Sequence, residues 1–215
     1  SEAQEQLVRR ERLAVLGQLA GGVGHELRNP LGVIANAVYY LRTALSDASD
    51  TTREYLDIIA QQVHIADTII TDLLSFARTR RANREPVRVT ELVAHVLSER
   101  PLPQGVTLVT EMSPDLTVYA DPGQMRTVLG NLVANAYQAM PEGGTLTVRA
   151  QESGDEIALS VTDTGCGISE GHMDRLFEPL FTTKARGIGL GLAISGNLIE
   201  ANGGRIEVTS QEGEG

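Results

Sequence analysis

The stretch that decides the fold of this chain spans residues 13–45, LAVLGQLAGGVGHELRNPLGVIANAVYYLRTAL. Its apolar residues recur at alternating steps of three and four, the pattern of a helix that packs along a seam against another helix. After Leu27 the frame slips by an insertion of four residues, close to Pro30, and the seam continues as Leu31, Ile34, Val38, Leu41 and Leu45. We therefore expect one long helix over residues 2–45 that is bent or locally unwound near Pro30.

A reactive cluster stands inside this helix, where residues 25–31 read HELRNPL. The heptad frame places His25 on the outward side of the seam, where another molecule or domain can reach it. Glu26 beside it can accept a proton, and Asn29 follows one turn later on the same face. A histidine that is merely solvated is the plain alternative for this position. The pattern nevertheless predicts a nucleophile, a base and a polar orienting group close together.

A second helix follows a short polar connection over residues 46–52. Its apolar residues keep the same alternating steps, so it also needs a seam partner over its whole length: Leu56, Ile59, Val63, Ala66, Ile70, Leu73 and Ala77. Two helices and a short loop form an antiparallel hairpin, which has a poor core alone. We expect a homodimer in which two hairpins form a four-helix bundle; a monomeric hairpin packed on the other domain is the alternative.

Composition and charge exclude several classes of protein. The 215 residues carry a formal net charge of −10, which argues against nucleic acid as a partner. Cys166 is the single cysteine, so an internal disulfide is excluded and a reducing, cytoplasmic compartment is expected. No apolar run is long enough to cross a bilayer, so we expect no membrane contact by this stretch. Both ends read as cut, and a returning strand is expected after QEGEG at the end of the chain.

The chain changes character after the second helix. Residues 78–86 lose the apolar period and gain positive charge, and we expect a hairpin domain over 1–81, a linker over 82–86 and a second domain over 87–215. In the second domain the pattern predicts strands at 87–90, 106–111, 116–120, 145–151, 157–163 and 205–210, and helices at 91–99, 122–140 and 189–200. This mixture predicts an α/β sandwich with helices on one sheet face.

Four pieces of the second domain suit a nucleotide. Asn131 and Asn135 lie one turn apart on a helix, and an amide oxygen is a suitable ligand for Mg²⁺. Asp163 ends a strand before a glycine-rich turn and can accept a hydrogen bond from an adenine amine. The third piece, RLFEPLFTTK over residues 175–184, joins aromatic rings and hydroxyls to Lys184, the only lysine of the chain.

The fourth piece, GIGLGL over residues 187–192, opens the last predicted helix and offers backbone N–H groups to anionic oxygens. The segment between Thr164 and Arg186 has little regular pattern, which favours a mobile lid. Each piece alone is weak, since asparagine pairs also cap helices and glycine repeats also form turns. The prediction of a nucleotide site rests on the four pieces occurring in this order.

With these pieces the chain closely resembles the transmitter region of bacterial sensor histidine kinases over essentially its whole length. HELRNPL resembles the H box, NLVANA the N box, DTGCGI the G1 box, FEPLFTTK the F box and GIGLGL the G2 box. FEPLFTTK with GIGLGL is most similar to the nitrogen-regulation subgroup. The resemblance implies a dimerisation and histidine-phosphotransfer hairpin followed by an ATP-binding domain of the Bergerat (GHKL) type, shared with gyrase, Hsp90 and MutL proteins.

The resemblance also implies roles for individual residues. His25 would be phosphorylated by ATP, Glu26 would act as base and Asn29 would orient water for a phosphatase activity, with a response regulator aspartate as acceptor. Asn135 would bind Mg²⁺ and Asp163 would read adenine. The other residues expected at the ATP site are Asn131, Gly165, Gly167, Ile168, Phe177, Phe181, Thr183, Lys184, Gly187, Gly189, Leu190 and Gly191.

One position departs from the family pattern. Gln138 stands where the N box often carries a lysine or arginine, and we expect Lys184 to supply that charge. Two other classes of protein remain as alternatives. A Bergerat ATPase that drives clamp motion would leave His25 and Glu26 idle, and a silent dimeric adaptor would leave the nucleotide pieces idle. The sequence leaves open whether a subunit phosphorylates its own His25 or that of its partner.

Overall fold

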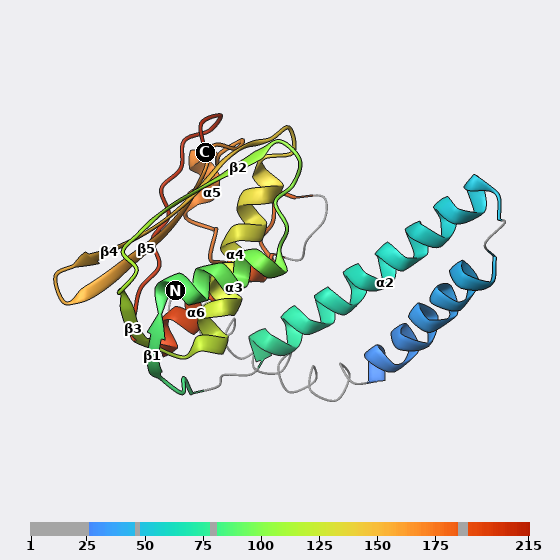
Figure 1. Cartoon of the computed structure of the whole chain (residues 1–215), viewed down its shortest axis with the longest axis horizontal. Coiled ribbons are helices and arrows are strands. Elements are labelled where there is room, and N and C mark those ends of the chain that lie inside the picture. The colour runs from blue at the N-terminus through green and yellow to red at the C-terminus, as the bar shows by residue number, and fades with distance from the viewer. Residues whose placement is uncertain (1–25, 46–47, 78–80, 185–188) are drawn as a thin grey trace, which may run out of the picture. The chain divides into compact units, whose positions relative to one another are not determined.

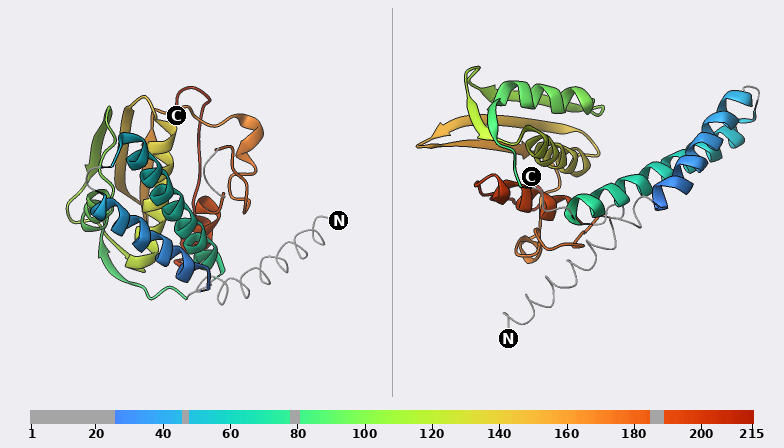
Figure 2. Two further views of the ribbon diagram at one scale, coloured as in Figure 1. Left: turned by 90° about the vertical axis from the view of Figure 1, so that its right-hand side faces the viewer. Right: turned by 90° about the horizontal axis from the view of Figure 1, so that it is seen from below.

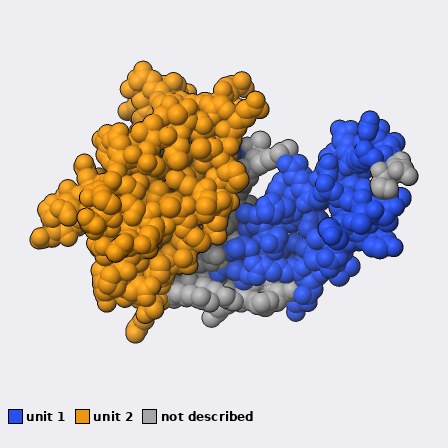
Figure 3. Space-filling view, viewed as in Figure 1, with its two compact units in different colours: residues 1–79, 184–190 blue, residues 80–183, 191–215 orange. Residues whose placement is uncertain are grey.

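The structure is a computed structural model that describes residues 26–45, 48–77, 81–184 and 189–215 (Figure 1). It divides into two compact units, residues 1–79 with 184–190 and residues 80–183 with 191–215 (Figure 3). The first unit holds the helical hairpin and the second holds both sheets. The fold class expected from the sequence, a helical hairpin followed by an α/β sandwich, is confirmed.

The hairpin pairs a helix whose described part covers residues 26–44 with α2, Asp50–Ala77. Ile70 and Leu74 are buried, and Leu31 and Leu73 pack against them. Leu31, Ile70 and Leu73 belong to the predicted seam, whereas Leu74 lies outside it. The helix continues through Pro30, so local unwinding is absent from residues 26–44. The N–H that proline lacks would bind the carbonyl of Glu26, an exposed residue whose backbone water can satisfy.

The connection between the helices is shorter than the expected residues 46–52. Ser49 accepts a hydrogen bond from the backbone N–H of Thr52 at 3.2 Å, and its hydroxyl also contacts the Thr52 hydroxyl at 2.9 Å. A serine that binds the N–H three residues later is a helix N-cap, which is why α2 starts at Asp50. The cap residue lies within the polar stretch that the sequence assigns to the loop.

The second unit contains two sheets. Its elements are β1 (Glu85–Arg88), α3 (Val89–Glu99), β2 (Val106–Met112), β3 (Thr117–Ala120), α4 (Pro122–Ala139), β4 (Gly144–Ser153), β5 (Glu156–Asp163), α5 (Glu170–Met173) and α6 (Gly191–Ala201). β1 pairs antiparallel with β3. In the larger sheet, ordered β2-β4-β5, β2 lies parallel to β4 and β4 antiparallel to β5.

The core of this unit lies between helices α3 and α4 and one face of the larger sheet. Leu146, Val148 and Ala150 alternate along β4 and are at most 4% exposed, so they share the face that the helices cover. Val96 of α3 and Val133 of α4 belong to the same buried cluster. Figures 1 and 2 show this layering from different directions, with the β4–β5 turn projecting beyond the helices. Residues 151–156 at that turn are all exposed.

Three predictions for the second unit differ from the structure. β1 and α3 each start two residues earlier than expected, α5 was not expected, and residues 205–210 are not assigned to a strand. The alternation that favoured a strand is real, because residues 206, 208 and 210 are half-buried and residues 205, 207 and 209 are exposed. Their contacts are made by side chains: Arg205 binds Glu156, and Ser210 accepts from the N–H of Ile168. Periodicity reports which face is covered, whereas a strand also requires a backbone ladder.

Within the described ranges, none of the helices combines the length and apolar character that crossing a bilayer requires.

Candidate functional site

Helix α4 carries the two asparagines of the N box. Val128, Leu129 and Val133 face the core and are at most 5% exposed, whereas Asn131 and Asn135 are half-buried. Asn131 Nδ2 donates to the carbonyl oxygen of Gly191 at 3.1 Å and to Ser195 Oγ at 3.3 Å. The first residue of α6 is thereby attached to the middle of α4.

The glycine-rich turn after β5 is attached to the end of the same helix. The backbone N–H of Cys166 donates to the carbonyl oxygen of Ala139 at 3.0 Å. A Cβ on Gly165 would lie 2.5 Å from that oxygen, so this close approach requires glycine. Asp163 Oδ1 accepts from the N–H of Gly165 at 2.9 Å, which fixes the carboxylate at the mouth of the turn.

The rest of this turn packs against residues 210–215. Gly167 has φ +65°, and a Cβ there would overlap the carbonyl group of Gln211. The N–H of Ile168 donates to Ser210 Oγ at 2.9 Å, and the N–H of Gly213 donates to the carbonyl oxygen of Cys166 at 2.8 Å. Both flanks of the turn are therefore held by hydrogen bonds, from α4 on one side and from residues 210–215 on the other.

The F box forms a compact cluster of rings and charges. The guanidinium carbon of Arg175 lies 4.3 Å from the ring centroid of Phe181, and the ring of His172 lies 5.6 Å from it. Phe177 is half-buried, and a Cβ on Gly196 of α6 would lie 3.6 Å from its ring. Thr183, at the end of this cluster, is exposed. The structure thus brings Phe177 against α6, and Phe181 against the turn that follows α5.

A strained turn sits between the two aromatic residues. The N–H of Phe181 donates to the carbonyl oxygen of Glu178 at 3.2 Å, and Leu180 has φ +66°. Pro179 before a residue of positive φ is the arrangement of a type II turn, in which glycine is preferred at the position that Leu180 occupies. A leucine held there stores backbone strain within a candidate site.

The remaining predicted nucleotide residues fall in the segment 184–190 of the first unit. Lys184 is exposed and Leu190 is 1% exposed. Gly189 has φ +67°, a conformation that favours glycine. Gly187 lies outside the described residues.

In the helical hairpin, Glu26 and Asn29 are both exposed on the helix that covers residues 26–44. They stand three residues apart and so lie on neighbouring turns of one face. His25 itself lies outside the described residues. His64, a second histidine of the hairpin, is exposed on α2.

A polar network joins the start of α4 to the end of α6. Asp121 caps α4 by accepting from the N–H of Gln124 at 3.0 Å, and it also accepts from the N–H of Asn83 at 2.9 Å. Asn202 accepts from the N–H of Asp121 at 2.7 Å and donates to Gln124 Oε1 at 2.8 Å. Arg84 donates to the carbonyl oxygen of Ala201 at 2.9 Å. Residues 83 and 84, within the expected linker, are thus bound to the ends of both helices.

This network also perturbs a carboxyl group. Burial acts to raise the pKa of Asp121, but the N–H groups of Gln124, Asn83 and Gly123 outweigh it. The pKa of Asp121 is therefore held below its ordinary value. The charged form is the one that caps the helix.

Sequence reasoning missed several residues of this arrangement. Ser195 is fully buried and donates to the carbonyl oxygen of Gly191 at 2.8 Å, so it completes the link from α6 to Asn131. Its spacing of four residues from Gly191 is the available signal, because such residues share a helical face. The carbonyl of Ala139 and the network around Asn202 have no sequence signal, since a main-chain oxygen and a surface asparagine occur everywhere.

No group of three or more His, Cys, Asp and Glu residues suited to a metal ion occurs in the part of the chain that the structure describes. The residues that α4 brings together are instead an amide pair, a fixed carboxylate and glycine-rich turns. Hydrogen bonds and backbone dipoles are the interactions that such a set can offer to a ligand.

Comparison with known proteins agrees with this arrangement. Residues 15–82 match the His Kinase A (phospho-acceptor) domain, and residues 120–215 match the histidine kinase-, DNA gyrase B- and HSP90-like ATPase family. The chain is 36% identical to the sensor histidine kinase ZraS of Escherichia coli K12 over 99% of its own length and 46% of that protein. It is also 36% identical to the signal transduction histidine-protein kinase AtoS of the same organism, over 100% of its own length and 36% of that protein.

Solved structures give the same result. Full-length ShkA in complex with AMPPNP matches with a TM-score of 0.76 at 27% identity, covering 92% of this chain and 43% of that one. ThkA in complex with the response regulator protein TrrA matches with a TM-score of 0.64 at 30% identity, covering 94% of this chain and 60% of that one. The chain spans about half the length of the ZraS relatives that it matches. Phospho-acceptor and ATPase modules thus follow each other in the order that the sequence motifs predict, and the chain belongs to the sensor histidine kinases.

Proposed function

We propose that this chain transfers the γ-phosphoryl group of ATP to His25 and then to an aspartate of a response regulator. The observation that carries the nucleotide half is that α4 is hydrogen-bonded both to the G1 turn, through Ala139, and to the first residue of α6, through Asn131. The relatives support both substrates, because ShkA was solved with the ATP analogue AMPPNP and ThkA with a response regulator.

ATP would bind the proposed ATP-binding domain, residues 87–215. Asp163 Oδ1 is occupied by the N–H of Gly165, which leaves the second carboxylate oxygen directed to accept from the adenine amine. Gly165 and Gly167 keep the backbone close to the base, and Ile168 would cover its apolar face. Near the phosphates we place Asn131 and the backbone N–H groups of Gly187, Gly189 and Gly191, with Lys184 as a point charge. Phe177, Phe181, Thr183 and Leu190 complete the proposed site.

Asn135 would provide the protein ligand for Mg²⁺. A single amide oxygen, without a carboxylate cluster among the described residues, fits an ion that arrives with the nucleotide and keeps phosphate oxygens and waters as its other ligands. When bound, the ion would supply neutralisation of phosphate charge. The residues that fit a resident, all-protein metal site are not present in the described ranges.

The transfer needs little from the protein beyond positioning. An imidazole nitrogen of His25 forms a bond to the γ-phosphorus, and the bond from that phosphorus to the β,γ-bridging oxygen breaks, so that ADP leaves with the electron pair. Glu26 accepts the proton that the other ring nitrogen gives up. In the second step an aspartate oxygen of the response regulator displaces the imidazole and forms an acyl phosphate.

We propose that two copies of the hairpin form the four-helix bundle. Leu27, Ile34, Leu41 and Leu45 belong to the predicted seam, yet they are 42–46% exposed in a single chain. Val38 of the same seam is 5% exposed. One hairpin therefore covers only part of its seam, and a second copy would cover the rest.

The central test is labelling with γ-labelled ATP. We expect an acid-labile, base-stable label that is lost in His25→Gln and retained in His64→Gln, which removes the exposed histidine of α2. Label that survives His25→Gln would overturn the proposal. ATP hydrolysis without labelling of the protein would favour the clamp-type ATPase, and absence of nucleotide binding would favour the adaptor.

A second activity is supported by the exposure of Asn29 next to Glu26. Asn29 would orient a water molecule toward the phosphorylated aspartate of the regulator. Asn29→Ala should then slow dephosphorylation of the regulator while His25 labelling persists. Equal dephosphorylation rates with and without the amide would refute this role.

The domain limits follow the same proposal. We assign residues 1–81 to the dimerisation and phosphotransfer hairpin, 82–86 to the linker and 87–215 to the ATP-binding domain. A cytoplasmic location is proposed because ATP and response regulators are found there and because exposed Cys166 favours a reducing compartment.

A further inference from the structure

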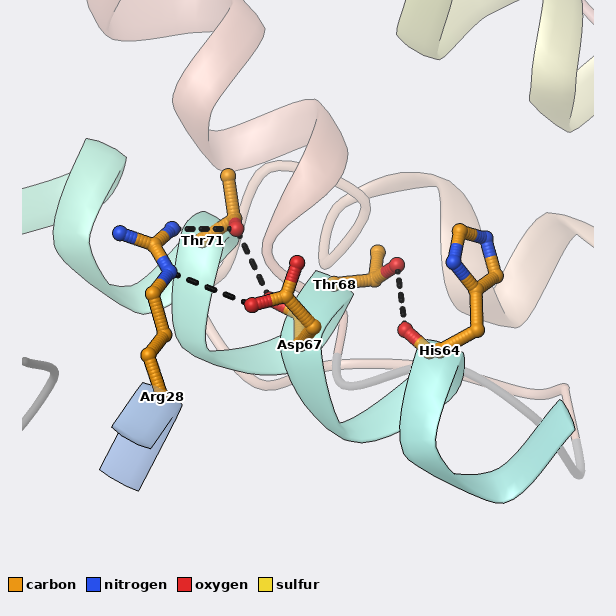
Figure 4. Close-up of polar contacts among 5 residues, drawn as sticks. All are labelled: Arg28, His64, Asp67, Thr68 and Thr71. Carbon is orange, nitrogen blue, oxygen red and sulfur yellow. Dashed lines mark hydrogen bonds and ion pairs between the residues drawn. The ribbon is translucent and has the colours of Figure 1, made fainter. Parts of the chain in front are cut away.

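Arg28 crosses from the first helix of the hairpin to α2. Its Nε donates to Asp67 Oδ1 at 3.2 Å, and its Nη2 donates to Thr71 Oγ1 at 2.7 Å (Figure 4). Thr71 in turn donates its hydroxyl to the carbonyl oxygen of Asp67 at 2.8 Å. One guanidinium thus binds two side chains that stand one helical turn apart. We call this set the Arg28 tether.

The Arg28 tether lies beside the apolar contact of the hairpin. Ile70, next to Thr71 in the chain, is 6% exposed, and Leu31 packs against it one turn after Arg28. The packing resists separation of the helices, while the two-pronged tether resists rotation of the first helix about its axis. An ion pair this exposed, with side chains 36% and 51% accessible, contributes little to stability. The tether therefore affects the orientation of the first helix more than the stability of the hairpin.

The tether sets the direction in which two other side chains point. Successive residues of an α-helix are rotated by about 100°, so Glu26 and Asn29 lie within about 60° of each other. Arg28 lies on a different side, toward α2. With Arg28 fixed to α2, Glu26 and Asn29 are held outward, and both are exposed. Loss of the tether would let this turn roll while the apolar contact persists.

We propose that Arg28 is a positioning residue for the reactions at His25, acting through Asp67 and Thr71 to orient Glu26 and Asn29. The inference rests on the proposed function. It makes no use of nucleotide binding, which we assign to residues 87–215. It predicts that the tether affects the rate of the chemical step and leaves the affinity for ATP unchanged.

The chain offers a matched control on the same two helices. Arg42 Nη2 lies 3.2 Å from Asp57 Oδ1, an exposed cross-hairpin ion pair far along the helix from residues 26–29. Arg28→Met and Arg42→Met remove the same charge from the same hairpin. Asp67→Asn and Asp57→Asn form the corresponding pair of variants on α2.

The experiment measures initial rates of His25 labelling against ATP concentration for the full chain. Arg28→Met should lower kcat at least tenfold with KM for ATP within twofold, whereas Arg42→Met should leave both within twofold. Arg28→Lys should recover only part of the loss, because an ammonium lacks the planar fork. Thr71→Ser should behave as the parent, Thr71→Ala should be slower, and Arg28→Met with Asp67→Asn should be no slower than Arg28→Met alone.

A purely structural role would lower the thermal midpoint or raise KM along with the loss of kcat, and it would affect the Arg42 variants alike. Either result overturns the proposal. Hydrogen exchange over residues 26–34 provides a readout without activity: it should quicken in Arg28→Met and not in Arg42→Met. If the parent chain fails to label His25, the proposed function is refuted. Unchanged hydrogen exchange in Arg28→Met would independently refute the proposed role of the Arg28 tether.

Discussion

The side-chain amide of Asn131 donates to the main-chain oxygen of Gly191 over 3.1 Å, across 60 residues of chain. Both amide hydrogens of Asn131 are used, the second by Ser195 Oγ. The N-box helix and the first turn of α6 are thereby held as one frame.

This bond predicts the effect of Asn131→Ala. Losing it should lower the free energy of unfolding by about 1 kcal/mol. ADP affinity should fall about tenfold, equivalent to about 1.4 kcal/mol, because Gly191 loses its anchor. Thermal unfolding and calorimetric titration with ADP measure the two effects. Ser195→Ala keeps the Asn131–Gly191 bond and should weaken ADP binding less; equal losses would contradict this account.

Gly165→Ala should disrupt the G1 turn. The added Cβ would lie 2.5 Å from the carbonyl oxygen of Ala139 and 2.6 Å from its Cβ, so the turn must move away from α4. We expect destabilisation by about 1–3 kcal/mol, with ADP binding reduced at least about tenfold. The control is Gly171→Ala, where the new Cβ meets no atom within 4 Å. Because Gly171 lies within α5, this variant should leave stability unchanged or raise it by up to about 1 kcal/mol.

Leu180→Gly should stabilise the second unit. Leu180 has φ +66° and is 58% exposed, so glycine relieves strain without removing core packing. The left-handed conformation costs an ordinary residue about 1–2 kcal/mol, part of which glycine returns through its greater freedom when unfolded. Leu180→Ala is the control: it shortens the side chain but keeps the strained backbone conformation, so it separates the two effects. If both variants unfold at the same denaturant concentration, strain at this turn is refuted.

Asp121→Asn should remove the part of the free energy of unfolding that the ionised Asp121 carboxylate contributes. The pKa of Asp121 is lower in the folded protein, so its contribution is fully present above the unfolded pKa and is lost as pH falls through the folded value. Asparagine has one acceptor oxygen, so it can keep the helix cap but loses the charge and the second N–H bond of the carboxylate. The stability difference from the parent should therefore be largest near neutral pH and shrink below about pH 4. Denaturant unfolding at several pH values, with Asp155→Asn in the exposed β4–β5 turn as control, measures it.

Ile34→Glu should dissociate the proposed dimer. Ile34 is 43% exposed in the single chain and belongs to the seam that a second copy would cover. A charge buried there without a partner is strongly unfavourable. Val33→Glu is the control, since Val33 is 69% exposed and lies outside the seam pattern. Sedimentation should give a monomer for Ile34→Glu and a dimer for Val33→Glu; the same state for both would count against this dimer.

Most elements could be predicted from the sequence because they rest on local periodicity. α4 was expected at 122–140 and occurs at Pro122–Ala139, since Asp121 is a recognisable cap and the apolar spacing is regular. The start of α2 was placed late because Ser49 sits inside a polar stretch and its cap bond is visible only in three dimensions. Residues 205–210 show that alternation alone does not make a strand.

The sequence alone determined the heptad seams, the order of the motifs and the side chains available for phosphoryl transfer, because these follow from spacing and from chemical identity. Only the tertiary structure decided which groups meet. The bonds from Asn131 to Gly191, from Cys166 to Ala139 and from Arg28 to Asp67 cross long stretches of chain. Spacing fixes a face of one helix or strand, whereas such contacts depend on how strands are ordered and helices packed, which no local pattern encodes.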